Sequence, residues 1–327
     1  MHTILTYVAV QNGSPTRASL EVLSRARQIS EGEGATCAAV VLAPEASAVA
    51  DELARYGAQK VFAVSSPDFS GHANTRVVAG LETLISRVQP QVVVFPSSEG
   101  VKDVLGALAV RTAATVLPDV ASFELKDAGV EALRPVMAAK FMARARVDGD
   151  LVLVSVRAGS YEAIEAPTET TVEEIVFSFD ESALRPTLRE VIGSTAGTVD
   201  LADAEVVVAA GRGVKDDAGK QLVVELADVL GAAIGSSRAV VENGMFPATA
   251  QIGQTGKVVS PDLYIGVGIS GAIQHVAGMS NSRTIVAINT NADAPIFDVA
   301  TYGIVGDLYK VLPILIEEIS KVKGMAA

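Results

Sequence analysis

Several residue types and patterns are scarce or missing in this chain. Tryptophan is absent and aromatic residues make up only 5%, against 49% hydrophobic residues, so Ala, Val, Ile and Leu must form the core. One cysteine, Cys37, excludes an internal disulfide, and its apolar run 37–42 predicts a small core residue. No apolar run reaches the ~20 residues of a membrane helix, and no signal or transit segment begins the chain. We therefore expect a soluble cytoplasmic protein.

The residue patterns of common catalytic sites are missing as well. The three histidines, His2, His72 and His275, are scattered and give no metal-binding spacing. No G-x-S-x-G turn offers a nucleophile, and Gly256-Lys257 lacks the full P-loop spacing. A net charge of −12 argues against nucleic acid or an anionic membrane as a partner. These absences predict no metal site and suggest that a bound cofactor does the chemistry.

The first half of the chain begins by alternating strand and helix patterns. The expected strands are 4–10, 36–42, 60–64 and 91–95, and the expected helices are 16–32, 46–56, 74–88 and 101–112. This alternation predicts a parallel sheet covered by helices on both faces. Further strand patterns follow without helices, at 121–124, 130–135, 137–146 and 151–156. They extend the sheet or form a small antiparallel annexe.

The turn Pro96–Gly100 follows a strand, at the end where α/β sheets bind ligands. A nucleotide or phosphate site is one interpretation. We favour the other, in which Ser97 or Ser98 caps the next helix, because no basic residue adjoins the turn until Lys102.

The stretch 167–197 has the polar, proline- and glycine-containing composition of a linker. We place the domain boundary near residue 192, which gives domains 1–192 and 193–327. The predicted fold class is α/β, with two doubly wound parallel-sheet domains.

The second domain is organised around residues 262–278. An apolar strand, 263–269, runs into the turn Ser270-Gly271-Ala272, and a helix is expected from Ala272 onward. Such a unit directs backbone N–H groups and a helix dipole at one point, which favours a phosphate. Gly266, Gly268 and Gly271 satisfy G-x-G-x-x-G, but the first two lie inside the strand. Asn289 stands where the NAD fingerprint has an acid, so this is not plainly an NAD site.

Two other strands of this domain also end in glycine and arginine. Strand 205–210 leads to Gly211-Arg212-Gly213, and strand 232–234 leads to Gly235-Ser236-Ser237-Arg238. Taken singly, these features are ordinary turns and solvated charges, and His275 alone would be a helix residue facing solvent. Because the carboxyl ends of parallel strands share one edge, we expect these turns to converge with Ser270-Gly271 and Asn289. A long, multiply charged ligand such as a dinucleotide fits that edge.

Several longer segments resemble the FAD domain of the electron transfer flavoprotein α subunit family. They are Gln-Ile-Gly-Gln-Thr-Gly-Lys (251–257), Pro-x-Leu-Tyr-Ile (261–265), Gly-Ile-Ser-Gly-Ala-Ile-Gln-His (268–275), Ile-Val-Ala-Ile-Asn (285–289), Ala-Pro-Ile-Phe (294–297) and Tyr-Gly-x-Val-Gly-Asp-Leu (302–308). Ile252 stands where the family more often has valine, and both residues are β-branched. The N-terminal half is similar more loosely, through Val-Val-Val-Phe-Pro (92–96) and Arg-Pro (134–135).

The resemblance implies a heterodimer with a β subunit and one FAD on a Rossmann-like C-terminal domain. The N-terminal domain would contact the partner without holding a nucleotide, and the β subunit would hold an AMP. The residues that the resemblance places against FAD are Arg212, Ser237, Arg238, Ile252, Gly253, Gln254, Thr255, Ser270, Gly271, Ala272, Ile273, Gln274, His275, Asn289 and Asp307. Among them, Arg238 would lie by the isoalloxazine ring, Thr255 near its N5 and His275 near its O2, as flavin-tuning residues.

The resemblance also implies a redox carrier with no substrate of its own rather than an enzyme. Such a carrier accepts electrons from flavin dehydrogenases and passes them to a quinone oxidoreductase or another acceptor through a flavin semiquinone. A donor or cation at His275 or Arg238 would stabilise the negative charge of that semiquinone. Two alternatives are a pyridine-nucleotide oxidoreductase domain and a structural or regulatory nucleotide-binding subunit.

Overall fold

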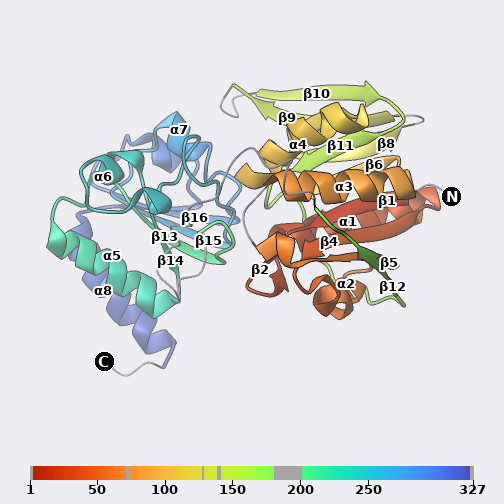
Figure 1. The fold of residues 1–327 in the computed structure, drawn as a ribbon. Helices are drawn as coiled ribbons and strands as arrows, with labels where there is room; N and C mark the ends of the chain where they lie inside the picture. The colour runs from red at the N-terminus through yellow and green to blue at the C-terminus, as the bar shows by residue number, and fades with distance from the viewer. Residues whose placement is uncertain (1–2, 71–73, 127–128, 138–140, 180–200, 325–327) are drawn as a thin grey trace. The chain divides into compact units, whose positions relative to one another are not determined.

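The computed structural model of the chain describes residues 3–70, 74–126, 129–137, 141–179 and 201–324 (Figure 1). The residues fall into two compact units, 1–191 and 192–327. The boundary predicted near residue 192 lies in the range 180–200, outside the described residues.

The N-terminal unit is built on a seven-stranded sheet in which every described pair is parallel. In spatial order the strands are β12 (Thr171–Val176), β5 (Lys60–Ser65), β4 (Thr36–Ala43), β1 (Thr3–Val8), β6 (Val92–Pro96), β11 (Val152–Val156) and β7 (Thr115–Val120). Cross-overs run in both directions from β1, so the strand order reverses between β1 and β6. This doubly wound arrangement is the predicted one.

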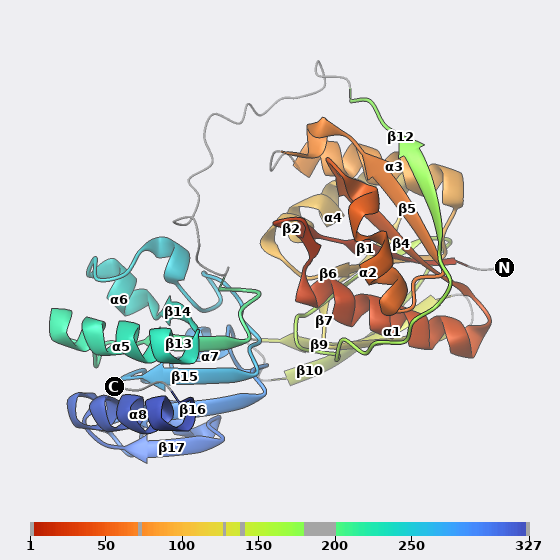
Figure 2. The same cartoon turned by 90° about the horizontal axis from the view of Figure 1, so that it is seen from below.

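Helices cover both faces of this sheet, as the alternating pattern predicts (Figure 2). The helices α1 (Arg17–Glu33) and α2 (Ala50–Arg55) pack in one apolar cluster, and α3 (Asn74–Val88) and α4 (Glu99–Thr112) pack in the other. The prediction gave α3 its observed bounds. The predicted helix 46–56 is instead a 3₁₀ turn, Ala46–Val49, followed by the short α2.

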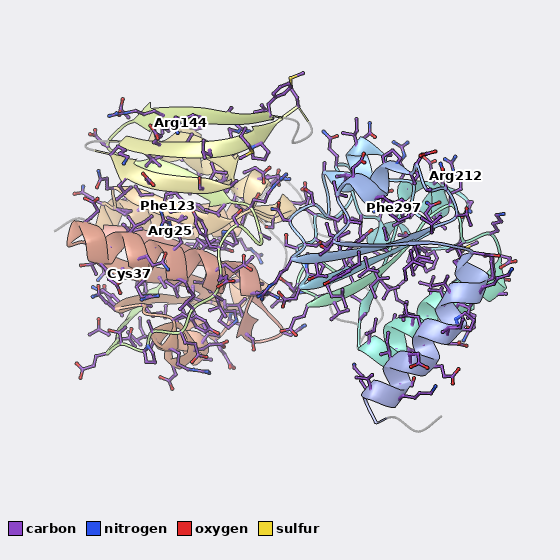
Figure 3. All side chains as sticks on the ribbon, turned by 180° about the vertical axis from the view of Figure 1, so that it is seen from behind. Arg25, Cys37, Phe123, Arg144, Arg212 and Phe297 are labelled. Carbon is purple, nitrogen blue, oxygen red and sulfur yellow. The ribbon has the colours of Figure 1, made fainter. Side chains whose placement is uncertain are left out.

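The strands that follow α4 take both of the expected arrangements. The strands β8 (Ser122–Lys126), β9 (Gly129–Val136) and β10 (Phe141–Asp148) form a separate antiparallel sheet in the order β10-β9-β8. Strand β11 joins the main sheet between β6 and β7. Phe123 and Arg25, on β8 and α1, are joined by a hydrogen bond of 3.1 Å from the guanidinium to the carbonyl of Phe123, which holds the small sheet against α1 (Figure 3).

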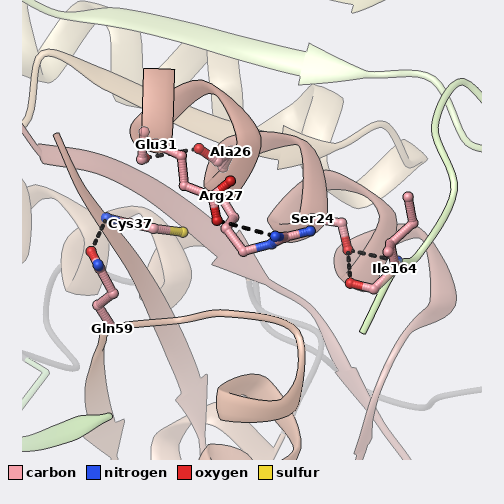
Figure 4. A network of polar contacts seen from close by, with 8 residues as sticks. Ser24, Ala26, Arg27, Glu31, Cys37, Gln59 and Ile164 are labelled. Atoms are coloured by element: carbon pink, nitrogen blue, oxygen red, sulfur yellow. Dashed lines mark hydrogen bonds and ion pairs between the residues drawn. The ribbon is translucent and has the colours of Figure 1, made fainter. Parts of the chain in front are cut away.

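Residues 157–170, called the crossing segment below, run from β11 over the helices to the opposite edge of the sheet. Gly159 N–H donates to the buried Glu21 carboxylate. Ser24 exchanges hydrogen bonds with the backbone of Ile164, as Figure 4 shows. The chain then enters β12, which pairs with β5 through residues 171–176. The part of the predicted linker at 171–176 is therefore a sheet strand, and the linker prediction is wrong there.

The C-terminal unit has a five-stranded parallel sheet with the order β14-β13-β15-β16-β17. The strands are β13 (Val206–Ala210), β14 (Ala233–Ser236), β15 (Leu263–Val267), β16 (Thr284–Asn289) and β17 (Tyr302–Val305). In chain order this is 2-1-3-4-5, the flavodoxin-like variant of the doubly wound fold. The order reverses between β13 and β15.

The two faces of this sheet are covered differently. The long helices α5 (Asp217–Leu230) and α8 (Leu308–Val322) share one apolar cluster. The cluster on the other face draws its residues from loops around 201–204, 252–259 and 294–297 and from the turn near Met279. Loops rather than long helices therefore cover that face, and they bring the sequence motifs of 251–278 against the sheet.

Candidate functional site

The reversal point between β13 and β15 brings together two of the predicted glycine turns. Gly211 N–H donates to Val267 O at 2.8 Å, and Gly213 N–H donates to Gly268 O at 3.0 Å. A Cβ on Gly211 would lie 2.2 Å from Gly268 O, so only glycine fits there. Gly268 also has φ +65, a conformation that L side chains rarely adopt. These glycines let two loops touch backbone to backbone at the edge where α/β sheets bind ligands.

The turn after β15 presents unpaired backbone N–H groups. Gly271 has φ +85, and its Cα packs against Ile296, whose N–H donates to Ser270 O at 3.1 Å. Within the described residues, the N–H groups of the four residues Gly271, Ala272, Ile273 and Gln274 donate to no other group. Consecutive free N–H groups beside a left-handed residue form an anion-binding concavity. An anion bound at this turn would therefore be held by backbone groups, as predicted, and its binding stays a prediction.

The helix expected from Ala272 onward is a single turn, α7 (Ile273–Val276). Its dipole is accordingly small, and the part of the prediction that relies on a helix dipole is wrong. Shortly after this turn, Gly278 packs against the backbone of Gly253, where a Cβ would lie 2.5 Å from the Cα of Gly253. The N–H groups themselves remain available.

A second loop, residues 251–257, lies against the same turn. Ile252 N–H donates to Ser236 O at 2.9 Å, and Gln254 N–H donates to Gln274 O at 2.8 Å. Gly253 has φ +142, and a Cβ there would lie 2.9 Å from Gln274 O. The loop thus joins the end of β14 to α7 and leaves Gln254 and Thr255 exposed.

The two arginines of the predicted site differ in their partners. Arg238, in the short helix α6 (Arg238–Glu242), is 68% exposed and pairs with Glu242 at 2.7 Å. Arg212 follows β13, is exposed, and makes no ion pair within the part of the chain that the structure describes (Figure 3). Ser237 N–H donates to Ala210 O at 2.9 Å and ties the start of α6 to the end of β13. The predicted convergence of these turns at one sheet edge agrees with these contacts.

Asn289 and Asp307 use their side chains within the protein. The Asn289 amide donates to Ile269 O at 2.7 Å and accepts from Asn291 N–H at 3.0 Å. Asp307 accepts from Tyr309 N–H at 3.1 Å and caps α8. Both residues fix turns at the edge, and their contact with a cofactor stays a prediction.

His275 is buried, so the simple expectation of a solvent-facing helix residue is wrong. Its Nε2 lies 2.7 Å from the hydroxyl of Tyr264, a fully buried residue of β15. Burial lowers the pKa of His275 to about 4, and the Ile252 carbonyl opposes this shift to a smaller extent. Burial also raises the pKa of Tyr264. Both side chains are therefore neutral at pH 7.

Tyr264 is the buried hydrogen-bond partner of His275, and the sequence does not single it out. In an apolar strand pattern a tyrosine indicates only a core position, and no spacing rule connects it to His275. Only its hydroxyl could have pointed to a polar neighbour, because a buried tyrosine hydroxyl needs a hydrogen-bond partner.

In the N-terminal unit, the corresponding edge is closed by side chains. Ser98 accepts from Val101 N–H at 3.2 Å and caps α4, which confirms the capping interpretation. Ser97 donates to Asp119 at 3.2 Å instead. Among the described residues there is no group of three or more metal-binding side chains, and no helix is long and apolar enough to span a membrane.

The strand order and the unpaired N–H groups of the C-terminal unit are those of a nucleotide-binding α/β unit. Comparison with known protein families identifies the family to which these units belong. A model described as "Electron transfer flavoprotein domain" matches residues 4–182, and one described as "Electron transfer flavoprotein FAD-binding domain" matches residues 200–280.

Similar proteins match along nearly the whole chain. The electron transfer flavoprotein subunit alpha of Mycobacterium tuberculosis is 40% identical over 327 residues, 99% of this chain and 100% of the relative. That of Bacillus subtilis is 38% identical over 311 residues, 94% of each chain. The acryloyl-CoA reductase electron transfer subunit beta of Anaerotignum propionicum is 31% identical over 354 residues, 98% of this chain and 96% of the relative.

The chain belongs to the electron transfer flavoprotein α subunit family. It is thus an electron-transfer protein, a carrier rather than an enzyme, and its C-terminal unit contains the family's FAD-binding domain. These relatives are named as subunits of an electron transfer flavoprotein.

Proposed function

We propose that this chain binds one FAD at the carboxyl edge of its C-terminal sheet and, with a β subunit, carries electrons between flavin dehydrogenases and a quinone oxidoreductase or another acceptor. The observation that carries the proposal is the run of four unpaired N–H groups at residues 271–274 beside the glycine turns of β13 and β15. These groups fit a pyrophosphate, which offers several anionic oxygens close together.

The other predicted residues are assigned by the same proposal. Arg212 is the cation available to the phosphates, since it has no ion pair among the described residues. Arg238, Thr255 and His275 are the flavin-tuning residues. Because His275 is neutral at pH 7, Arg238 is the positively charged member of these three residues. The bound flavin would supply the one-electron chemistry.

The remaining contacts of the proposed site come from backbone and small side chains. They are Ser237, Ile252, Gly253, Gln254, Ser270, Gly271, Ala272, Ile273, Gln274, Asn289 and Asp307. The partner β subunit holds an AMP in this proposal, and the N-terminal unit contacts that subunit without holding a nucleotide. Cytoplasmic location stays a prediction from the sequence.

The test is to co-express the chain with its β subunit and identify the bound cofactor. We expect a yellow complex with absorption near ~450 nm that releases one FAD per heterodimer on denaturation. NADH added to the complex should give no direct change in the spectrum. A colourless complex, or one that releases NAD, would refute the proposal and favour the pyridine-nucleotide alternative.

A substitution at the N–H groups makes the test specific to this edge. Ala272 is exposed, so Ala272→Glu places a carboxylate beside the unpaired N–H groups without filling a cavity. We expect Ala272→Glu to lower FAD affinity at least about tenfold by repelling the pyrophosphate. Ala272→Gln, which has the same shape and no charge, is the matched control. Equal affinities of the two variants would place the phosphates elsewhere.

A further inference from the structure

A buried polar pair lies beneath the loop 251–257. Tyr264 is inaccessible to solvent and His275 is 6% exposed. Their rings lie 6.3 Å apart between centroids, and the hydroxyl and Nε2 are 2.7 Å apart. The pair is surrounded by apolar residues of the loop-covered face, among them Ile252 and Met279. Which atom donates in this hydrogen bond depends on which nitrogen of His275 carries the hydrogen.

The hydroxyl of Tyr264 has one described partner, Nε2 of His275. If Nε2 carried the hydrogen, it would donate to the hydroxyl, and the hydroxyl hydrogen would be left without an acceptor in the core. An unmade hydrogen bond of that kind is costly. If instead Tyr264 donates to Nε2, both atoms are satisfied, and the single hydrogen of the neutral imidazole lies on Nδ1.

The surroundings of Nδ1 agree with this tautomer. Nδ1 is buried and makes no hydrogen bond of good geometry within the described residues. The polar group that acts on the ring from the loop side is the carbonyl of Ile252, which favours protonation. Because Nε2 is engaged by the Tyr264 hydroxyl, Nδ1 is the ring nitrogen left for the Ile252 carbonyl, and a hydrogen on Nδ1 would be attracted by that oxygen. The imidazole thus connects β15 to the start of the loop.

The loop above the pair has a role in the proposed site. Ile252 precedes Gly253, Gln254 and Thr255, and Gln254 N–H donates to the carbonyl of Gln274, the residue before His275. A change in the position of the imidazole is therefore transmitted to the loop through Ile252 and through the backbone of α7.

We propose that Tyr264 is a positioning residue of the cofactor site. It donates to Nε2 of His275, fixes the proton on Nδ1 beneath the Ile252 carbonyl, and so holds the loop 251–257 in the conformation that receives the isoalloxazine ring. His275 acts from beneath the loop as a neutral hydrogen-bond donor. The inference rests on the proposed function for its ligand, but the tautomer is a property of the protein alone.

The first experiment measures the tautomer by long-range ¹H–¹⁵N correlation on the heterodimer with ¹⁵N-histidine in this chain. The chain has three histidines, and His275→Gln identifies the signal of His275 by its loss. At pH 7 we expect a protonated Nδ1 and an unprotonated Nε2. A protonated Nε2, or a ring protonated on both nitrogens, would overturn the proposal.

The second experiment removes the donor. Tyr264→Phe should shift His275 toward a mixture of tautomers, increase hydrogen exchange in residues 251–257, and lower FAD affinity about tenfold. Tyr309→Phe is the matched control, since it also removes a hydroxyl hydrogen bond of this unit, to Asp216 at 2.8 Å, but has no contact with His275. An unchanged tautomer in Tyr264→Phe would contradict the proposal.

Two variants of His275 separate positioning from packing. The amide nitrogen of asparagine takes the place of Nδ1 and can donate to the Ile252 carbonyl, whereas that of glutamine takes the place of Nε2. We expect His275→Asn to keep FAD affinity within about threefold of the wild type and His275→Gln to lose more than about tenfold. The reverse order would defeat the positioning role. A wild-type complex with the expected tautomer but no FAD would refute the proposed function and leave the pair purely structural.

Discussion

The two units share a doubly wound parallel sheet, but the edges at the carboxyl ends of their strands are built by different means. In the N-terminal unit, side chains bond to one another across this edge. Asp119 accepts from Ser97, pairs with Arg157 at 3.3 Å, and donates its N–H to Ser155 at 2.9 Å. Its φ of +54, unusual for a residue other than glycine, is held by these bonds.

In the C-terminal unit the same edge is made of backbone. Loops meet where glycine removes the side chain, at Gly211 with Gly268, at Gly253 with Gly278, and at Gly271 with Ile296. Side chains that close an edge satisfy the polar groups there, whereas backbone packing leaves N–H groups of residues 271–274 unpaired. The comparison teaches that one fold has an edge of mutually bonded side chains or an edge with unpaired N–H groups, according to whether side chains or glycines occupy the turns described.

The largest expected effect comes from adding a side chain to the backbone-built edge. In Gly211→Ala, the new Cβ would lie 2.2 Å from Gly268 O and 2.5 Å from Ile269 Cα, which are backbone atoms that cannot turn away. We expect the unfolding free energy of the C-terminal unit to fall by about 4 kcal/mol. Urea unfolding followed by hydrogen exchange measures each unit separately.

Gly106→Ala is its control. Gly106 lies in the middle of α4, and no atom lies within 4 Å of its Cβ position, so this change should stabilise the N-terminal unit by ~0.5–1 kcal/mol. If Gly211→Ala were as harmless as Gly106→Ala, the backbone contact would not be tight and the comparison would fail.

The next effect depends on pH. The folded C-terminal unit lowers the pKa of His275 from 6.5 to about 4, so between these values the unfolded chain binds a proton that the folded chain does not. The free energy of unfolding is therefore unaffected by His275 above pH 6.5. It decreases as the pH falls toward 4, by up to ~3 kcal/mol. Unfolding curves from pH 4 to 7 measure it, and His275→Asn should flatten the dependence. An equal slope in that variant would assign it to other groups.

A smaller effect is expected at the edge built from side chains. Asp119→Ala removes the acceptor for Ser97 and Arg157 and leaves a left-handed backbone that alanine disfavours. We expect a loss of about 2 kcal/mol in the N-terminal unit and no change in FAD affinity. Asp119→Asn, which tolerates that backbone and keeps one acceptor oxygen, should cost about half as much. Loss of flavin from Asp119→Ala would show that the two edges are coupled.

The smallest effect on stability is expected at Arg238. Its pair with Glu242 is exposed, so Arg238→Ala should change the unfolding free energy by less than about 0.5 kcal/mol. If Arg238 supplies the charge near the flavin, the same change should lower the potential of the first one-electron reduction by ~60 mV, a tenfold effect. Spectroelectrochemical titration measures it, and Glu242→Gln, which keeps the arginine, should not lower that potential.

The sequence predicted regular elements well and irregular ones poorly. The helix α3 has strong apolar periodicity and was predicted with its observed bounds. The strand β7 was missed because Pro118-Asp119 interrupts its pattern, and a register shift opposite Val154 and Val156 accommodates them. The strand β12 was missed because an edge strand needs few apolar residues, and its sequence TVEEIV lies in a polar stretch. Pairing with β5, not local propensity, makes it a strand.

The sequence predicted the separate motifs of the candidate site but not the contacts that bring them together. The glycine motif 266–271 indicated an anion site because turns of this type expose N–H groups. That Gly268 meets Gly213, or that Gly271 meets Ile296, depends on contacts between distant segments, and no local pattern contains them. The pair of Tyr264 and His275 has the same origin, since the two residues meet only through the fold of the loop between them.

The crossing segment has a consequence for how the N-terminal unit is made. The strands β1, β4 and β5 are synthesised first, but β5 gains its outer neighbour only when residues 171–176 arrive, about a hundred residues later. Until then the polar groups of Glu21 and Ser24 on α1 have no backbone partners from residues 159 and 164. A sheet closed by such distant pairing folds slowly and late. We therefore expect the nascent unit to become resistant to protease only after its last strand has left the ribosome, so that a chain stopped before residue 171 would expose an unpaired strand and aggregate.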